Sequence, residues 1–225
     1  MNFNFNDLST TSFTSDSKNY LKPYNIYPVS LTKIEQTTLK GSKDPNASYP
    51  VISLEFSGKD GVFSQNIFVP STDADFERHE NPSSHKPMPS RFDQFQYTLM
   101  QIVEAINPDG AQKIKDNSSK LKTIDDFTGL VIKALKGKDK IVFLKLVGQN
   151  SNGTVYSRLP NACLIGTDGK PAPLNFISAD ETKLRFSNYE MTQMRQYQNA
   201  KPTNMDSVKD SNTKTDYDDL DDLEL

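Results

Sequence analysis

Two stretches in which apolar residues alternate strictly constrain this chain most. The first stretch has its apolar residues at Ile52, Leu54 and Phe56. The second repeats the spacing at Val142, Leu144 and Leu146. Successive side chains of a strand point to opposite sides, so each stretch predicts a β-strand with one apolar face. The chain must therefore build a sheet and bury one face of it against other elements.

The sequence around these stretches predicts an antiparallel sheet. The first strands cover residues 24–39, 49–56 and 62–69, and polar turns rich in Gly, Asn and Ser separate them. Such short turns are typical of a meander. Further strands are predicted at residues 141–147, 154–159, 161–166 and 182–186.

Two helices are predicted between the groups of strands, because apolar residues there recur every three or four positions. Ser90 is a favourable N-cap with Asp93 three residues later, and Thr123 stands in the same relation to Asp126. The Asn, Pro and Gly of residues 107–110 are expected to end the first helix.

Three strands, a helical segment and two strands follow the order of an OB-fold. We therefore expect an α+β, mainly β chain: an OB-like antiparallel Greek-key barrel with a helical insertion at about 88–137, between strands three and four. Another α+β arrangement is the alternative. The barrel would cover residues 19–190, with disordered termini made of an arm (1–18), a polar linker (191–215) and an acidic tail (216–225).

Charge divides the chain into a body and a tail. The formal net charge is −3, and without the six acidic side chains of residues 216–225 it becomes +3. The one cysteine, Cys163, excludes an internal disulfide and a multi-cysteine zinc site. The polar start and the short apolar runs predict neither a secretory signal nor a membrane span. We expect a cytoplasmic protein without cofactor or metal, in the host cytoplasm if a phage encodes it.

The chain resembles the phage-type single-stranded DNA-binding proteins. The resemblance lies in the barrel-like order, the aromatic residues of the strands, the acidic C-terminal tip and two short motifs. These motifs are Asp73-Ala74-Asp75-Phe76-Glu77-Arg78 and Arg91-Phe92-Asp93-Gln94-Phe95. It implies a protein that coats single strands during replication, recombination or repair and has no enzymatic activity. In bacterial relatives the tail ends in Pro-Phe, whereas this chain ends in Glu224-Leu225, so the partner of the tail stays open.

A protein that coats single strands needs cations for the phosphates and flat side chains for the bases. Strand alternation predicts which aromatic and basic residues point away from the core, although aromatic strand residues also commonly pack in cores. The predicted nucleic-acid-binding residues are Lys33, Lys43, Tyr49, Lys59, Phe68, Phe143, Lys145, Tyr156 and Arg158.

The acidic tail is predicted to compete with DNA for the basic groove and to bind replication or recombination proteins. Its residues are Asp216, Tyr217, Asp218, Asp219, Leu220, Asp221, Asp222, Leu223, Glu224 and Leu225. A tail that only promotes solubility is the alternative. The sequence leaves the oligomeric state open, with a dimer or cooperative binding along DNA as options.

Two other functions remain open from the sequence alone. One is a metal-dependent nuclease, whose ligands would come from Asp73, Asp75, Glu77, His79 and His85. Their spacing fits no standard site. The other is a structural or adaptor protein, such as a virion or scaffold component, that binds no nucleic acid.

Deleting residues 216–225 is expected to tighten binding to single-stranded DNA and to weaken recruitment of partner proteins. The physical reason is the loss of a tethered polyanion that competes with DNA phosphates. Fluorescence titration of both proteins across a salt series measures the effect. Equal affinities at every salt concentration would rule out competition by the tail.

Overall fold

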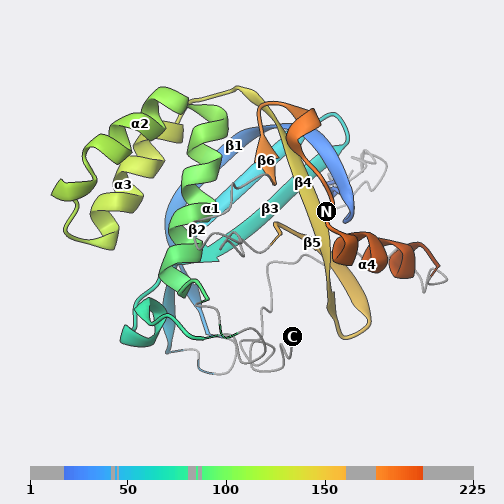
Figure 1. Cartoon of the computed structure of the whole chain (residues 1–225), viewed down its shortest axis with the longest axis horizontal. Coiled ribbons are helices and arrows are strands. Elements are labelled where there is room, and N and C mark those ends of the chain that lie inside the picture. The colour runs from blue at the N-terminus through green and yellow to red at the C-terminus, as the bar shows by residue number, and fades with distance from the viewer. Residues whose placement is uncertain are drawn as a thin grey trace, which may run out of the picture.

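An antiparallel sheet forms the centre of the protein (Figure 1). The computed structural model describes residues 18–41, 44, 46–80, 85, 88–160 and 176–199 of the 225-residue chain. Within these residues the strand order is β3-β2-β1-β4-β5, and β6 pairs with β4. The strands are β1 (Asn25–Lys40), β2 (Ser48–Gly58), β3 (Gly61–Phe68), β4 (Ile141–Ser151), β5 (Thr154–Arg158) and β6 (Ile177–Ser178).

Helices lie on both sides of β4 (Figure 1). The first group is α1 (Arg91–Ile106), α2 (Pro108–Asp116) and α3 (Ile124–Leu135), and the last helix is α4 (Asn188–Asn199). Short 3-10 turns are η2 (Asp73–Phe76), η3 (Ser118–Lys120) and η4 (Glu181–Lys183). The predicted α+β chain with a mainly antiparallel sheet and a helical insertion is therefore confirmed.

The core lies between one face of the sheet and α1–α3. The alternating residues of both predicted strands are fully buried there: Ile52, Leu54, Phe56, Val142, Leu144 and Leu146. Leu99, Ile102 and Val103 of α1 are equally buried and belong to the same cluster. The predicted apolar faces are therefore confirmed, and we call this side of the sheet the core face.

Both predicted helix starts are confirmed by reciprocal hydrogen bonds. The Asp93 amide donates to Ser90 Oγ (3.0 Å), and the Ser90 amide donates to Asp93 Oδ2 (3.0 Å). Thr123 and Asp126 make the same exchange at 3.1 and 3.0 Å. Each exchange satisfies backbone donors that the first turn of a helix leaves without intrahelical partners.

The two motifs that carried the family resemblance pack against each other. Arg78 Nε donates to Asp93 Oδ2 at 2.7 Å, and Arg91 Nη1 lies 3.4 Å from Asp75 Oδ1. The rings of Phe76 and its counterpart on α1, Phe92, have centroids 5.0 Å apart. These contacts fix η2 against the start of α1.

The helical insertion contains one helix more than the sequence predicted. Residues 107–110 do end α1, but they also begin α2, because Pro108 occupies the first helical position, where a missing amide costs nothing. Asn107 Oδ1 accepts from the Gly110 amide at 3.1 Å. Asn107 Nδ2 donates to the Ala134 carbonyl at 2.8 Å, which ties the start of α2 to the end of α3.

Two predictions near the C-terminus are wrong. The strand expected at 182–186 lies earlier, as β6, because Asp180 caps η4 by accepting from the Thr182 amide (3.0 Å) and hydroxyl (2.7 Å). The polar linker was expected from 191, but α4 continues to Asn199. The remaining expectations, for residues 1–17 of the arm, the strand at 161–166, the rest of the linker and the tail, lie outside the described residues.

The two ends of the sheet approach each other through the segment before β1. Tyr20 forms a parallel bridge with Val62 of β3, and the Leu21 amide donates to the Val62 carbonyl at 2.9 Å. Ser157 Oγ of β5 donates to the Leu21 carbonyl at 2.6 Å. Gly61 has a φ of +140° and leaves room for the Asn19 carbonyl where a Cβ would clash. The segment thus links β3 to β5.

Replacing Asp93 by Ala is expected to lower the free energy of unfolding by about 1–2 kcal/mol, because a cap and a bidentate ion pair are lost. The hydrogen bond from the Arg78 side chain is the main cause that lowers the pKa of Asp93 below its usual value, and the hydrogen bonds with Ser90 lower it further. Burial acts in the other direction and raises this pKa, but it is outweighed. A lowered pKa gives stability that is complete above the usual aspartate value and disappears as the pH falls through the folded value.

Urea unfolding at neutral and acidic pH measures this difference. Wild type and Asp93→Ala should converge in stability at low pH. Glu104→Ala, also on α1, is the control, because the ion pair of Glu104 with Lys115 of α2 is exposed and contributes about 0–1 kcal/mol. Equal losses from both substitutions would contradict the assignment.

Candidate nucleic-acid interface

The predicted binding residues lie mainly on the sheet face turned away from the core, which we call the opposite face. Residues paired across antiparallel strands share a face. Lys33 pairs with Glu55, beside a bulge that lies between Leu31 and Lys33. The bulge shifts the alternation by one residue, so that Leu31 and Ile34 both belong to the core face and Lys33 to the opposite face.

The register places six further predicted residues on the opposite face. Along each strand, these residues and their partners alternate with the buried residues of the core face, so both members of each pair point to the opposite face. The pairs are Tyr49 with Leu39, Phe68 with Val51, Phe143 with Pro28, Lys145 with Ile26, Tyr156 with Gln149 and Arg158 with Val147. Lys59 is exposed in the turn between β2 and β3, and Lys43 lies outside the described residues.

The aromatic candidates form three separate positions along the sheet. Tyr49 and Phe68 are diagonal neighbours on β2 and β3, and both are half-buried. Half-buried Phe143 pairs with Pro28, near the other end of β1. Along β1, Pro28 lies about 35 Å from Leu39, the partner of Tyr49. Tyr156 is 40% exposed on the β4–β5 hairpin. The opposite face therefore offers spaced aromatic surfaces rather than one pocket.

Lys33 is the most accessible basic residue of the predicted set on this face. Its side chain is about half exposed, and its Nζ lies 2.7 Å from Glu35 Oε1. An exposed pair of this kind contributes little to stability and exchanges readily with other ions. Lys33 can therefore contact a phosphate without loss of a buried interaction.

Lys145 has the predicted orientation but not the accessibility that a free groove residue needs. It is only 4% exposed, because α4 and the segment before it cover the side chain. Its Nζ donates to the Arg185 carbonyl at 2.7 Å and to the two carboxylate oxygens of Glu190 at 3.0 and 3.1 Å. The Nζ also lies 5.3 Å from the centroid of the Phe186 ring.

Arg158 is partly buried beside this contact. Its Nε is buried and has no hydrogen-bond partner among the described residues. Burial lowers the pKa of the Arg158 guanidinium, while the nearby Tyr24 and Tyr189 side chains oppose that shift. The guanidinium stays charged at neutral pH, so it is a cation without a hydrogen-bonded acceptor at Nε.

Sequence reasoning missed the tyrosines that surround Arg158. Tyr24 has a φ of +59°, which turns the chain just before β1. Its ring packs so closely on Gly148 that a Cβ there would lie 2.6 Å from Tyr24 Cε2. Tyr197 of α4 packs on the same ring, with centroids 5.5 Å apart and planes at 46°. Alternation on a strand gives no signal for contacts made by a loop and a distant helix.

Two of the residues proposed for a metal site, Asp75 and His85, serve other contacts. Asp75 Oδ2 accepts from the amides of Ser71 and Thr72, each at 2.9 Å. Burial would raise the pKa of Asp75, but these hydrogen bonds and Arg91 outweigh it and lower that pKa. His85 Nδ1 lies 2.7 Å from Glu80 Oε1. Among the described residues, no three His, Cys, Asp or Glu side chains gather to hold a metal ion.

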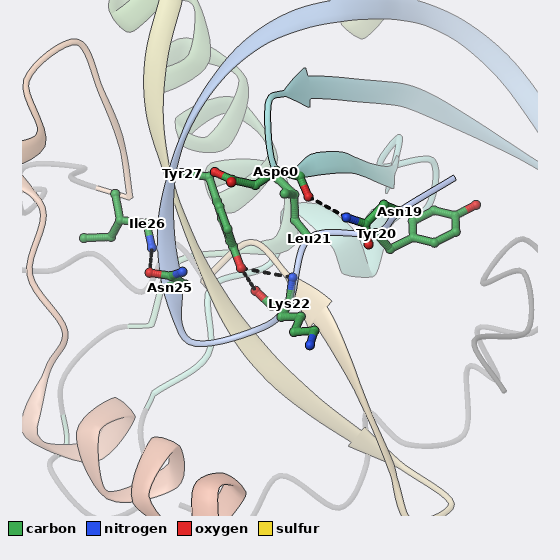
Figure 2. Close-up of a pocket in the computed structure, with 8 residues that line it drawn as sticks. All are labelled: Asn19, Tyr20, Leu21, Lys22, Asn25, Ile26, Tyr27 and Asp60. Carbon is green, nitrogen blue, oxygen red and sulfur yellow. Dashed lines mark hydrogen bonds between the residues drawn. The ribbon is translucent and has the colours of Figure 1, made fainter. Parts of the chain in front are cut away.

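A cavity of about 240 Å³ lies between the segment before β1 and the β2–β3 turn. Figure 2 shows Tyr27 in its wall, with a hydroxyl that accepts from the Lys22 amide and donates to the Lys22 carbonyl, both at 3.1 Å. Asn19 Nδ2 donates to the Asp60 carbonyl at 3.0 Å. These hydrogen bonds hold in place the segment that links β3 to β5, so we interpret the residues that line the cavity as structural rather than ligand-binding.

Comparison with other proteins adds no assignment to this geometry. Within the described part of the chain, no helix has the length and apolar character needed to cross a membrane. No family model matches the chain, and neither a curated protein nor a solved structure does.

Proposed function

We propose that the protein binds single-stranded DNA along the opposite face of its sheet and coats it without sequence preference. The observation that carries the proposal is the gathering of seven predicted residues on that face, with aromatic rings at three spaced positions. Bases of any sequence can stack on such rings, at about 1–3 kcal/mol per base, while cations follow the phosphates. The setting we propose is DNA replication or recombination in the cytoplasm.

The fold we propose for this function is an OB-like barrel. Its support is the sheet order, in which β1 pairs with both β2 and β4, together with the insertion of α1–α3 between β3 and β4. The contacts of Leu21 with β3 and β5 bring the free edges of the sheet together. In addition, the Leu159 amide donates to Gln65 Oε1 of β3 at 2.9 Å. OB-folds commonly bind oligonucleotides on the face of the barrel strands.

The charge distribution supports the same function. Once the acidic tail is set apart, the remaining chain carries a formal charge of +3. Lys33 and Lys59 are exposed at the β1–β2 pair and at the following turn. We propose that residues 216–225 compete with DNA for this basic surface and recruit replication or recombination proteins when DNA displaces them.

Replacing Tyr156 by Ala is expected to weaken binding to a fluorescent dT oligonucleotide about tenfold, because one exposed stacking surface is lost. Phe76→Ala is the matched control. Phe76 is similarly exposed (47%, against 40% for Tyr156) but belongs to η2, outside the sheet strands, and packs on Phe92 of α1. Fluorescence anisotropy at constant salt measures both affinities. If the two substitutions weaken binding equally, stacking on Tyr156 is excluded.

A further inference from the structure

Helix α4 covers the part of the opposite face where β4 carries Lys145. In Figure 1, α4 lies beside the β4–β5 hairpin, on the side away from α1–α3. Its anchor is the contact between Lys145 Nζ and the Glu190 carboxylate, at 3.0 and 3.1 Å. The side chains of this pair are only 5% and 17% exposed, so water screens their attraction little.

Apart from this anchor, α4 is held weakly. No described residue of α4 is buried, whereas α1 and α3 each bury several apolar side chains. Tyr189 of α4 is 73% exposed, and half-buried Tyr197 packs on the Tyr24 ring. Few buried contacts mean that a segment can open at low free-energy cost.

Glu190 stabilises both the helix and its docking. Its Oε2 accepts from the Ser187 amide at 2.6 Å, and its own amide donates to Ser187 Oγ at 3.2 Å. This is a capping box, which starts α4 at the place where the carboxylate meets Lys145. A single carboxylate therefore joins the start of the helix to the covered cation.

A second cation adjoins the covered one. Val147, two residues after Lys145 on β4, pairs with Arg158 of β5. Lys145 and Arg158 are therefore diagonal neighbours on the opposite face, at positions roughly 7–8 Å apart. Arg158 Nε lacks a hydrogen-bond partner among the described residues, so an anion with several oxygens would satisfy it.

We propose that Lys145 and Arg158 form a phosphate-binding point for single-stranded DNA and that α4 is a displaceable cover over it. In the covered state the Glu190 carboxylate binds Lys145 at the position that a backbone phosphate would take. The Tyr197 ring packs against the Tyr24 ring at the position that a stacked base would take. A DNA phosphate can reach Lys145 only when α4 leaves. This inference rests on the proposed function, because it assigns a contact and a regulation to the same face.

Glu190→Gln in the full-length chain tests the cover. Glutamine keeps the capping box but removes the charge opposite Lys145. We expect amide hydrogen exchange in residues 188–199 to become about tenfold faster and the affinity for a dT oligonucleotide to rise by about three- to tenfold. Glu181→Gln is the matched control, because Glu181 is an exposed glutamate of the neighbouring turn η4 and its loss changes the net charge equally.

A measurement on the wild type tests the same displacement without a substitution. Saturating dT oligonucleotide should accelerate exchange in residues 188–199. Binding that slows exchange there would overturn the proposal, and so would a Glu190→Gln protein with the affinity of Glu181→Gln. If neither the wild type nor any variant binds dT at low salt, the proposed function itself fails. If all of them bind dT but Glu190→Gln binds no more tightly than Glu181→Gln, the displaceable cover is rejected while the proposed function stands.

Discussion

The pairing of β1 with two different strands holds the structure together. The first part of β1, from Asn25 to Ser30, pairs with β4, and the second part, from Ser30 to Lys40, pairs with β2. The bulge near Leu31 lets one strand serve both partners and keeps apolar side chains on the core face through the change. Without this strand, the β2–β3 hairpin and the β4–β5 hairpin would have no common sheet, and α1–α3 would have no continuous surface to cover.

That arrangement leaves one face of the sheet for function. The core face is closed by helices whose starts are fixed by capping boxes and by the ion pairs between η2 and α1. The opposite face carries aromatic and basic residues, which a chain built only for stability would more often replace by small polar ones. Aromatic rings at spaced positions, with basic residues between them, are what binding to single strands requires.

The sequence predicted those parts of the fold that local periodicity determines. The alternation at Ile52 and Val142, and the caps at Ser90 and Thr123, depend on neighbouring residues alone, and all appear in the structure. A third capping signature, Ser187 with Glu190, was present in the sequence but was not predicted to begin a helix, because a polar linker was expected from residue 191. The covering of Lys145 was not predictable, because it depends on a contact between residues far apart in the chain.

Titration of the full-length protein with a fluorescent dT oligonucleotide at two salt concentrations tests the central claim most directly. We predict binding that does not depend on base sequence and that weakens steeply as salt rises, because each neutralised phosphate releases counterions. Weak binding that does not change with salt would contradict a nucleic-acid interface on the opposite face.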